Sequence, residues 1–290
     1  TNQFIPEIGS MELEEIDWNA LWMKKHLIRT ISSGSDLQEE RWDQMAPWYQ
    51  LWSEHDEYYP KLLQRVKMDR DWSVLDIGCG TGIISIAAAI RSKRVTAIDI
   101  SSQMLDILKS EADRRFFGNI RYLHQTWESI KLNSDIKSHD VVIASRAIAR
   151  TGDLQESLQK INQATKKFAY VTAWGGEEGE FIHSFHQAIG RTHTETPDDI
   201  YVYNLLHRMN IYPNVEQLLC KNQILYDTPD HALESYQILL HLTPEETNIA
   251  RDFLFTHLKR RKNGKYETPE TRTRWSLFWW EKNHTDTENP

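Results

Sequence analysis

The chain has 290 residues, of which 40% are hydrophobic and 26% are charged, as in ordinary globular domains. No apolar stretch approaches the roughly 18 residues of a membrane-spanning helix, so no membrane insertion is expected. Forty-two acidic side chains outnumber 34 basic ones, which gives a net charge of −8. The densest basic cluster, residues 258–265, is interpreted as a solvated helix end and turn, so no nucleic-acid partner is expected.

The two cysteines, Cys79 and Cys220, are too few for a disulfide scaffold or a four-thiolate zinc site. The amino end, TNQFIPEIGSMELEE, lacks a basic segment followed by an apolar core, so we predict no secretory signal and expect a cytoplasmic location. His183 and His186 lie three residues apart on a predicted helix, without a third ligand in view. We therefore predict no metal site.

Residues 1–70 are predicted to form a helical amino-terminal lid. The first helix is predicted from apolar residues that recur near a helical period: Ile16, Leu21, Met23, Leu27, Ile28 and Ile31. A second helix is expected to be capped by Asp36, with Glu39 at capping-box spacing, and to break or kink at Pro47. A short third helix is expected over residues 59–66.

From residue 71 to residue 290 we predict one α/β domain with a doubly wound sheet. Short β-branched runs alternate with helical patterns, which is typical of parallel strands covered by helices on both faces. The first five strands are expected at residues 73–78, 95–100, 119–125, 139–145 and 167–174. Helices are expected between them at residues 83–92, 101–116 and 154–165.

The remainder of the chain is less regular. Helices are predicted over residues 181–191 and 198–209, a sixth strand over 215–226, and a helical pair over 230–262. Thr243 should cap the second helix of that pair, with Pro244 at its first position. The segment TRWSLFWWEK alternates as a final strand whose tryptophans, including Trp275 and Trp280, are interpreted as core. Insertions are placed at about residues 176–214 and 227–270.

The most informative motif is VLDIGCGTG, residues 74–82, which is a strand, a glycine turn and a helix start. Glycines allow positive φ and a close approach of the backbone to a ligand. A dinucleotide fingerprint would need a third glycine where Ile83 stands, and a phosphate-binding P-loop would need a lysine that is absent. Instead, Asp76 at the strand end would repel a pyrophosphate and would suit a ligand with an amino group.

A second acid, Asp99, lies 23 residues after Asp76, at the end of the next predicted strand. A carboxylate at that position accepts hydrogen bonds from both hydroxyls of a ribose. The two acids together indicate a nucleoside with a positively charged, amino-bearing arm. S-adenosylmethionine has these parts.

The motif VLDIGCGTG, followed by AIDIS and QML, strongly resembles class I S-adenosylmethionine-dependent methyltransferases of the type 11/25-like small-molecule subgroup. The resemblance covers roughly residues 73–175. It implies a Rossmann-like seven-stranded sheet whose last strand is antiparallel and inserted between strands five and six. It also implies S-adenosylmethionine as cofactor and S-adenosylhomocysteine as product.

Carried over residue by residue, the resemblance implies a cofactor site. The methionine arm and its carboxylate would be wrapped by Gly78, Cys79, Gly80, Thr81 and Gly82, with Asp76 beneath them. Asp99 would hold the ribose, Ile100 and Met104 would pack on adenine, and Ser145 would lie near the methyl group. In this family an acidic residue usually contacts the adenine amino group, and the corresponding position in this sequence holds Thr126. Trp127 either stacks on adenine or seals the core, and Glu128 is either a site residue or a helix-start acid.

The methyl acceptor is constrained mainly by absences. The predicted fourth strand is followed by Ser-Arg-Ala-Ile rather than the Asn/Asp-Pro-Pro-Tyr/Phe of enzymes that methylate base or amide nitrogens. Two cysteines do not suggest arsenic methylation. We therefore expect a small-molecule acceptor, bound near Tyr49 of a lid segment and near Arg146. Arg146 pairs either with an anionic group of the substrate or in a surface ion pair. No catalytic base stands out, as expected where positioning supplies much of the rate.

The leading hypothesis is a methyltransferase acting on a small molecule. A non-catalytic protein that binds S-adenosylmethionine as a sensor or assembly partner is an alternative, favoured if Trp or Arg side chains fill the pocket. A methyltransferase acting on protein or RNA is a third hypothesis, favoured by an open or basic face beside Ser145. The sequence does not decide the oligomeric state.

Overall fold

The computed structural model describes residues 15–33, 38–178, 180–191 and 197–282. Its centre is a seven-stranded sheet with strand order β3-β2-β1-β4-β5-β10-β6. The strands in spatial order are β3 (Ile120–His124), β2 (Arg94–Asp99), β1 (Ser73–Ile77), β4 (His139–Ala144), β5 (Thr165–Glu178), β10 (Thr271–Glu281) and β6 (Asn214–Asn222). β10 is antiparallel to both of its neighbours, so the predicted inserted antiparallel strand is confirmed.

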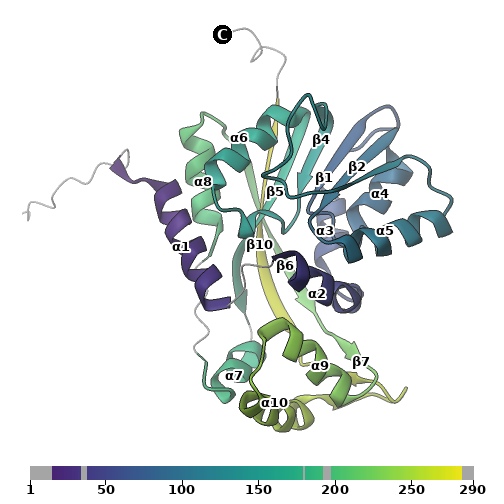
Figure 1. The fold of residues 1–290 in the computed structure, drawn as a ribbon, viewed down its shortest axis with the longest axis vertical. Coiled ribbons are helices and arrows are strands. Elements are labelled where there is room, and N and C mark those ends of the chain that lie inside the picture. The colour runs from purple at the N-terminus through teal and green to yellow at the C-terminus, as the bar shows by residue number, and fades with distance from the viewer. Residues whose placement is uncertain (1–14, 34–37, 179, 192–196, 283–290) are drawn as a thin grey trace, which may run out of the picture.

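Helices cover both faces of this sheet (Figure 1). One face packs against α1 (Trp18–Ser33), α6 (Leu154–Ala164) and α8 (Asp199–Arg208). The other face packs against α3 (Tyr58–Leu63), α4 (Ile83–Arg91) and α5 (Ser102–Arg114). Every residue of β1 is buried, as expected for a parallel strand covered on both sides.

The final strand divides its side chains between the two layers as its alternation predicts. Trp275 and Leu277 contribute to the layer beneath α3 and α4, whereas Phe278 and Trp280 contribute to the opposite layer. The aromatic run therefore fills core on both sides of the sheet. A register shift between Arg274 and Trp275 interrupts the pairing of β10 with β5.

A second group of elements lies at one end of the molecule, at the bottom of Figure 1. It contains α7 (Glu180–Ala188), α9 (Pro229–Leu240), α10 (Pro244–His257) and a small sheet of β7 (Leu225–Tyr226), β9 (Tyr266–Glu267) and β8 (Lys259–Arg260). These helices share one buried apolar cluster. Thr243 caps α10 with a complete capping box and Pro244 at the first turn, as predicted, but the helix ends at His257 because residues 259–260 pair with β9.

The structure refines two helices of the amino-terminal segment. α2 (Gln38–Ser53) continues through Pro47, so the helix does not break there, and Met45 and Ala46 beside the proline are buried. The predicted first helix is present as α1, but its exposed side chains include Leu21, Met23, Leu27 and Ile28, so the aliphatic period does not mark the buried face.

The helix α1 instead buries an aromatic face. Trp22 is buried, its indole N–H donates to the carbonyl of Thr151 at 2.8 Å, and its ring meets Tyr201 edge to face. A large ring with a hydrogen-bond partner thus decides the orientation of the helix. Asp36, the predicted cap of α2, lies outside the described residues.

Candidate functional site

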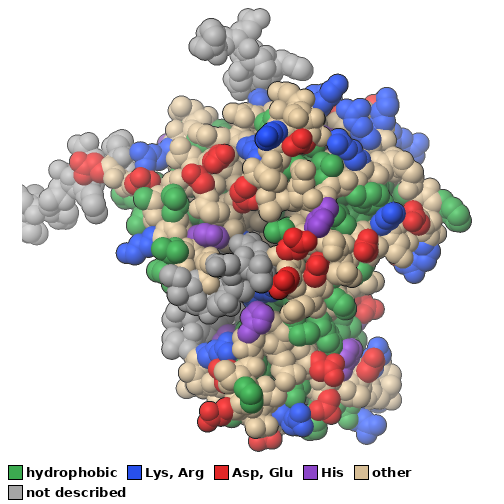
Figure 2. Space-filling view, in the orientation of Figure 1, with side chains coloured by type: hydrophobic (Ala, Val, Ile, Leu, Met, Phe, Trp, Pro, Cys, Tyr) green, Lys and Arg blue, Asp and Glu red, His purple; other side chains and the backbone are tan. Residues whose placement is uncertain are grey.

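A cavity of about 270 Å³ opens at the carboxyl ends of β1, β2 and β4. This is the edge at which the chain turns from one half of the sheet to the other, and where open α/β sheets bind ligands. The cavity is lined by Trp42, Tyr49, Ile77, Gly78, Gly80, Ile98, Asp99, Ile100, Met104, residues 125–128 and residues 145–151. In Figure 2, acidic side chains gather over α2, and the Lys and Arg side chains at the upper right lie over the opposite end of the sheet.

The glycine turn between β1 and α4 forms one wall of the cavity. A Cβ on Gly78 would lie 2.7 Å from the Cβ of Ala147, and φ at Gly78 is +64°. A Cβ on Gly82 would lie 2.1 Å from Leu108, and φ there is +89°. Both positions therefore require glycine, as the motif predicted, because the turn is pressed between the loop after β4 and the helix α5.

Two other residues of the turn, Cys79 and Thr81, do not line the cavity. Cys79 and Thr81 are buried, and Cys79 packs with Leu105 and Leu108 beneath the turn. Burial, together with the nearby carboxylates of Asp99 and Asp76, raises the pKa of the Cys79 thiol well above its usual value. Cys79 is therefore an inert packing residue, since the reactive form of cysteine is the thiolate.

Asp99 sits at the end of β2 with its carboxylate in the cavity wall. One of its oxygens accepts the backbone N–H of Gly80 at 2.7 Å, and the other accepts that of Ser101 at 2.9 Å. Burial raises the pKa of this carboxyl, although the backbone hydrogen bonds act against that shift. The side chain thus braces the glycine turn and keeps lone pairs available to a ligand.

Asp76 lies beneath the turn and does not line the cavity. It is buried, one oxygen accepts the hydroxyl of Ser85 at 2.6 Å, and the other has no hydrogen-bond partner among the described residues. Burial, and to a lesser extent the charge of Asp99, raises the pKa of Asp76 to about 7. A buried acceptor without a donor fits a site that completes its hydrogen bonds when a ligand is bound.

The opposite end of the cavity is apolar. Ile98, Ile100, Met104 and Trp127 line it, which makes it the better surface for a flat base. The indole N–H of Trp127 donates to the carbonyl of Ser157 at 3.4 Å, so the ring also seals the core beneath the cavity.

The loop after β3 supplies two further lining residues with structural partners. The hydroxyl of Thr126 accepts the backbone N–H of Ser129 at 3.1 Å. The carboxylate of Glu128 accepts the hydroxyl of Thr151 at 2.6 Å, which joins this loop to the loop after β4. Glu128 is therefore more than a helix-start acid.

The helix α2 closes the cavity from above. Its Trp42 and Tyr49 line the cavity, and the ring of Tyr49 lies 3.6 Å from the Cβ position of Gly80. Asp43 accepts the hydroxyl of Ser101 at 2.5 Å and the backbone N–H of Gln103 at 3.0 Å. The lid helix is thus attached to the first turn of α5.

The residues after β4 form the third wall. The hydroxyls of Ser145 and Tyr58 lie 2.7 Å apart, and the hydroxyl of Tyr58 lies 2.6 Å from that of Thr172. Burial raises the pKa of Tyr58 to about 12, so its hydroxyl stays protonated near neutral pH. Arg146 also lines the cavity and pairs with the carboxylate of Asp56 at 2.8 Å.

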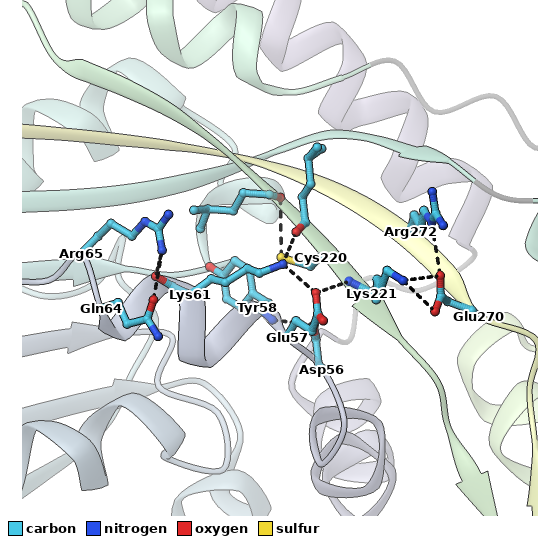
Figure 3. Close-up of polar contacts among 12 residues, drawn as sticks. Asp56, Glu57, Tyr58, Lys61, Gln64, Arg65, Cys220, Lys221, Glu270 and Arg272 are labelled. Atoms are coloured by element: carbon cyan, nitrogen blue, oxygen red, sulfur yellow. Dashed lines mark hydrogen bonds and ion pairs between the residues drawn. The ribbon is translucent and has the colours of Figure 1, made fainter.

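The turn that carries Asp56 and Tyr58 is fastened to β6, as Figure 3 shows. The backbone N–H of Glu57 donates to the carbonyl of Lys221, and the backbone N–H of Lys221 donates to the carboxylate of Glu57, both at 3.2 Å. The ammonium of Lys61 bridges the Glu57 carboxylate and the carbonyl of Leu219, both at 2.6 Å. These contacts place Asp56 against Arg146 and Tyr58 against Ser145.

Most residues that the sequence suggested for the site line one cavity. They are Tyr49, Gly78, Gly80, Asp99, Ile100, Met104, Thr126, Trp127, Glu128, Ser145 and Arg146. Asp76, Cys79, Thr81 and Gly82 lie in or beneath the turn instead of the lining. Sequence reasoning missed Trp42, Asp43, Asp56 and Tyr58, whose roles depend on contacts between distant segments.

Among the residues that the structure describes, no three His, Cys, Asp or Glu side chains are grouped as a metal site requires. Within the same part of the chain, no helix has the length and apolar character needed to cross a membrane. Both cysteines are free and buried.

Comparison with known proteins agrees with this geometry. Residues 68–200 match a family described as a methyltransferase domain. These residues form a class I S-adenosylmethionine-dependent methyltransferase domain. The chain is accordingly a methyltransferase, with S-adenosylmethionine as its cofactor. The crystal structure of a candidate methyltransferase from Bacillus halodurans C-125 shares the fold, with a TM-score of 0.53, 13% identity, and coverage of 77% of this chain and 97% of that one.

Relatives by sequence extend beyond that domain. A Haemophilus influenzae protein, described as uncharacterized, is 27% identical over 280 residues, which cover 93% of this chain and 98% of the relative. A Coxiella burnetii ubiquinone biosynthesis O-methyltransferase is 31% identical over 86 residues, which cover 30% of this chain and 36% of that enzyme. The activity and substrate of the latter therefore describe that protein alone.

Proposed function

We propose that this methyltransferase transfers the methyl group of S-adenosylmethionine to a small molecule held in the cavity beneath α2. Asp99 would hold the ribose, the apolar end with Ile100, Met104 and Trp127 would hold adenine, and the glycine turn would hold the methionine arm. The observation that carries the proposal is the position of Asp99, a carboxylate in the cavity wall between an apolar end and a glycine turn.

The lid supports a small acceptor rather than a macromolecule. Asp43 attaches α2 to the first turn of α5, so Trp42 and Tyr49 cover the cavity instead of leaving a flat face beside Ser145. The acidic side chains gathered over α2 also oppose a polyanion (Figure 2). Both features disfavour protein or RNA as the acceptor.

The described residues support catalysis by positioning. The sulfonium of the bound cofactor supplies an already activated methyl group, so an acceptor that arrives deprotonated needs no base. Tyr58 has a pKa of about 12, and its hydroxyl is occupied by Ser145 and Thr172. It therefore orients Ser145 rather than removing a proton.

A second candidate function is binding of the cofactor without catalysis. The observation that favours it is the packing beside Ser145, where the Tyr58 hydroxyl meets Ser145 and the guanidinium of Arg146 lies over the Tyr58 ring. The two functions differ in one outcome, because a binding protein would retain S-adenosylmethionine unchanged in the presence of every metabolite.

The test is to incubate the protein with S-adenosylmethionine labelled in the methyl group and with a fractionated cell extract. Mass spectrometry should then find label in a small metabolite, with release of S-adenosylhomocysteine. The variant Asp99→Asn should lose this transfer, whereas Asp106→Asn, which changes an exposed carboxylate on α5, should retain it. Label in protein or RNA would contradict the proposed acceptor class, and retention of the cofactor without transfer would support the second function.

A further inference from the structure

Arg146 is one of two arginines, with Arg150, in a cavity lining that also holds the acidic Asp99 and Glu128. It follows Ser145 in the cavity wall, its side chain is only 18% exposed, and its backbone has φ of +56°. Its backbone N–H donates to the hydroxyl of Thr172 at 2.9 Å, which helps to hold this strained conformation. A bulky residue at positive φ is costly, and such strain concentrates at functional sites.

The guanidinium is enclosed by aromatic rings. Its central carbon lies 3.7 Å from the ring centroid of Tyr58, 4.5 Å from that of Trp275 and 5.4 Å from that of Tyr59. Burial disfavours the charged form, but Asp56 and the neighbouring tyrosines raise the pKa of Arg146 above its usual value. The group therefore carries a permanent positive charge beside the glycine turn.

Asp56 does not satisfy this cation completely. The ion pair uses Nη2 of Arg146, and the carboxylate of Asp56 also accepts the backbone N–H of Tyr58 at 2.9 Å. Nε of Arg146 is buried and has no hydrogen-bond partner among the described residues. A buried charge is stable only when paired and fully hydrogen-bonded, so the guanidinium has capacity for a further acceptor.

In the described structure, a further unpartnered donor belongs to Trp275, whose ring lies beside the guanidinium, and another belongs to Trp174, whose ring contacts that of Trp275. The indole nitrogens of Trp174 and Trp275 are buried and lack partners in the described part of the chain, and the two rings meet at 5.2 Å. The register shift between Arg274 and Trp275 lies at this position of β10. Among the described residues, Arg146 and these two tryptophans thus each carry an unpartnered donor, which is the chemistry that receives an anion, and the tryptophan rings lie behind the cavity lining.

We propose that Arg146 is the carboxylate-binding residue of the methyl-transfer cavity. The cavity then has an apolar end for a base, the Asp99 carboxylate for the ribose hydroxyls, and the guanidinium of Arg146 for a carboxylate. The two oxygens of a carboxylate match the forked donors of a guanidinium. The carboxylate belongs either to the methionine arm of the cofactor or to the acceptor. This inference rests on the proposed function, because it assumes that the cofactor lies along this cavity.

The first arm of the test is a binding cycle. Calorimetry compares S-adenosylhomocysteine with its decarboxylated analogue, which differs only in the carboxylate, on the wild type and on the Arg146→Gln variant. If Arg146 binds the cofactor carboxylate, the wild type should prefer S-adenosylhomocysteine by at least tenfold, and the variant should lose most of that preference. Arg121→Gln, which changes an exposed arginine on β3, should keep it.

The second arm detects an acceptor carboxylate. Benzoate and its uncharged counterpart benzamide are titrated into protein saturated with S-adenosylhomocysteine. An acceptor site predicts that benzoate binds at least tenfold more tightly than benzamide in the wild type and loses this advantage in Arg146→Gln. A carboxylate preference that depends on Arg146 in either arm supports the proposal and identifies the source.

A variant that leaves Asp56 buried without its cation is at risk of unfolding. The double variant Arg146→Gln with Asp56→Asn removes both charges and serves as the folded alternative, verified by its melting temperature. Equal carboxylate preference in wild type and variants, in both arms, would overturn the proposal. Failure of the wild type to bind S-adenosylhomocysteine at all would instead overturn the proposed function.

Discussion

Replacing Asp99 by asparagine tests the cofactor site at its centre. The carboxylate accepts the N–H of Gly80 at 2.7 Å and that of Ser101 at 2.9 Å, and it is proposed to accept both ribose hydroxyls. The amide of asparagine must direct an N–H₂ group at one of these backbone donors. The substitution therefore disturbs the glycine turn as well as the ribose contact.

The expected loss can be worked from these contacts. Hydrogen bonds to a charged group contribute about 1.5–3 kcal/mol each, and asparagine keeps one acceptor oxygen without the charge. Losing one ribose hydrogen bond and weakening the other therefore costs roughly 3 kcal/mol. Since 1.4 kcal/mol corresponds to a tenfold change, affinity for S-adenosylhomocysteine should fall by about 100-fold.

Isothermal titration calorimetry measures this loss, with Asp106→Asn as the matched control for removing an exposed carboxylate from α5. The control should bind as the wild type does. If Asp99→Asn folds normally and binds S-adenosylhomocysteine within threefold of the wild type, the assignment of the ribose contact is refuted.

Gly82→Ala should destabilise the protein by roughly 2–4 kcal/mol in urea unfolding, because its Cβ would meet Leu108 at 2.1 Å and φ is +89°. Burial lowers the pKa of His139 from 6.5 to about 4, so between these pH values the unfolded chain binds more protons than the folded chain. The free energy of unfolding should therefore fall by at most roughly 3 kcal/mol as the pH drops from 6.5 to about 4. The variant His139→Gln should not show this fall. Asp43→Ala should release the lid from Ser101 and speed hydrogen exchange in α2 severalfold.

Each of these three predictions has a control variant. Gly118→Ala should be nearly neutral, because nothing lies within 4 Å of its Cβ position. Replacing the exposed His55 by glutamine should preserve the pH profile, and replacing the exposed Glu40 of α2 by alanine should leave exchange unchanged. A tolerated Gly82→Ala, an unaltered pH profile in His139→Gln, or unchanged exchange in Asp43→Ala would contradict the respective argument.

The sheet and the glycine turn were predictable because local patterns encode them. A β-branched run, a turn rich in glycine and a helix start follow one another within residues 73–91, and no distant residue is needed to recognise them. Asp99 could be placed for the same reason, since the carboxyl ends of neighbouring parallel strands meet at one edge. The final strand was predictable from its strict alternation of large apolar side chains.

Other features depend on tertiary contacts that no local pattern encodes. The pair between Arg146 and Asp56 joins the loop after β4 to the turn before α3, and the attachment of Asp43 to Ser101 joins α2 to α5. The buried face of α1 is set by Trp22 and its partner across the core, which outweighs the aliphatic period. The glycine turn, Tyr49 and Arg146 could therefore be named from the sequence, whereas the contacts of Asp43 and Asp56 with distant segments could not.

Crystals of the protein soaked with S-adenosylhomocysteine, and in parallel with NAD and ATP, would show which ligand the cavity accepts. We predict that S-adenosylhomocysteine alone occupies the cavity, with its ribose hydroxyls on the Asp99 carboxylate and its base against Ile100 and Trp127. A nucleotide phosphate bound against the turn at Gly78, with S-adenosylhomocysteine excluded, would contradict it.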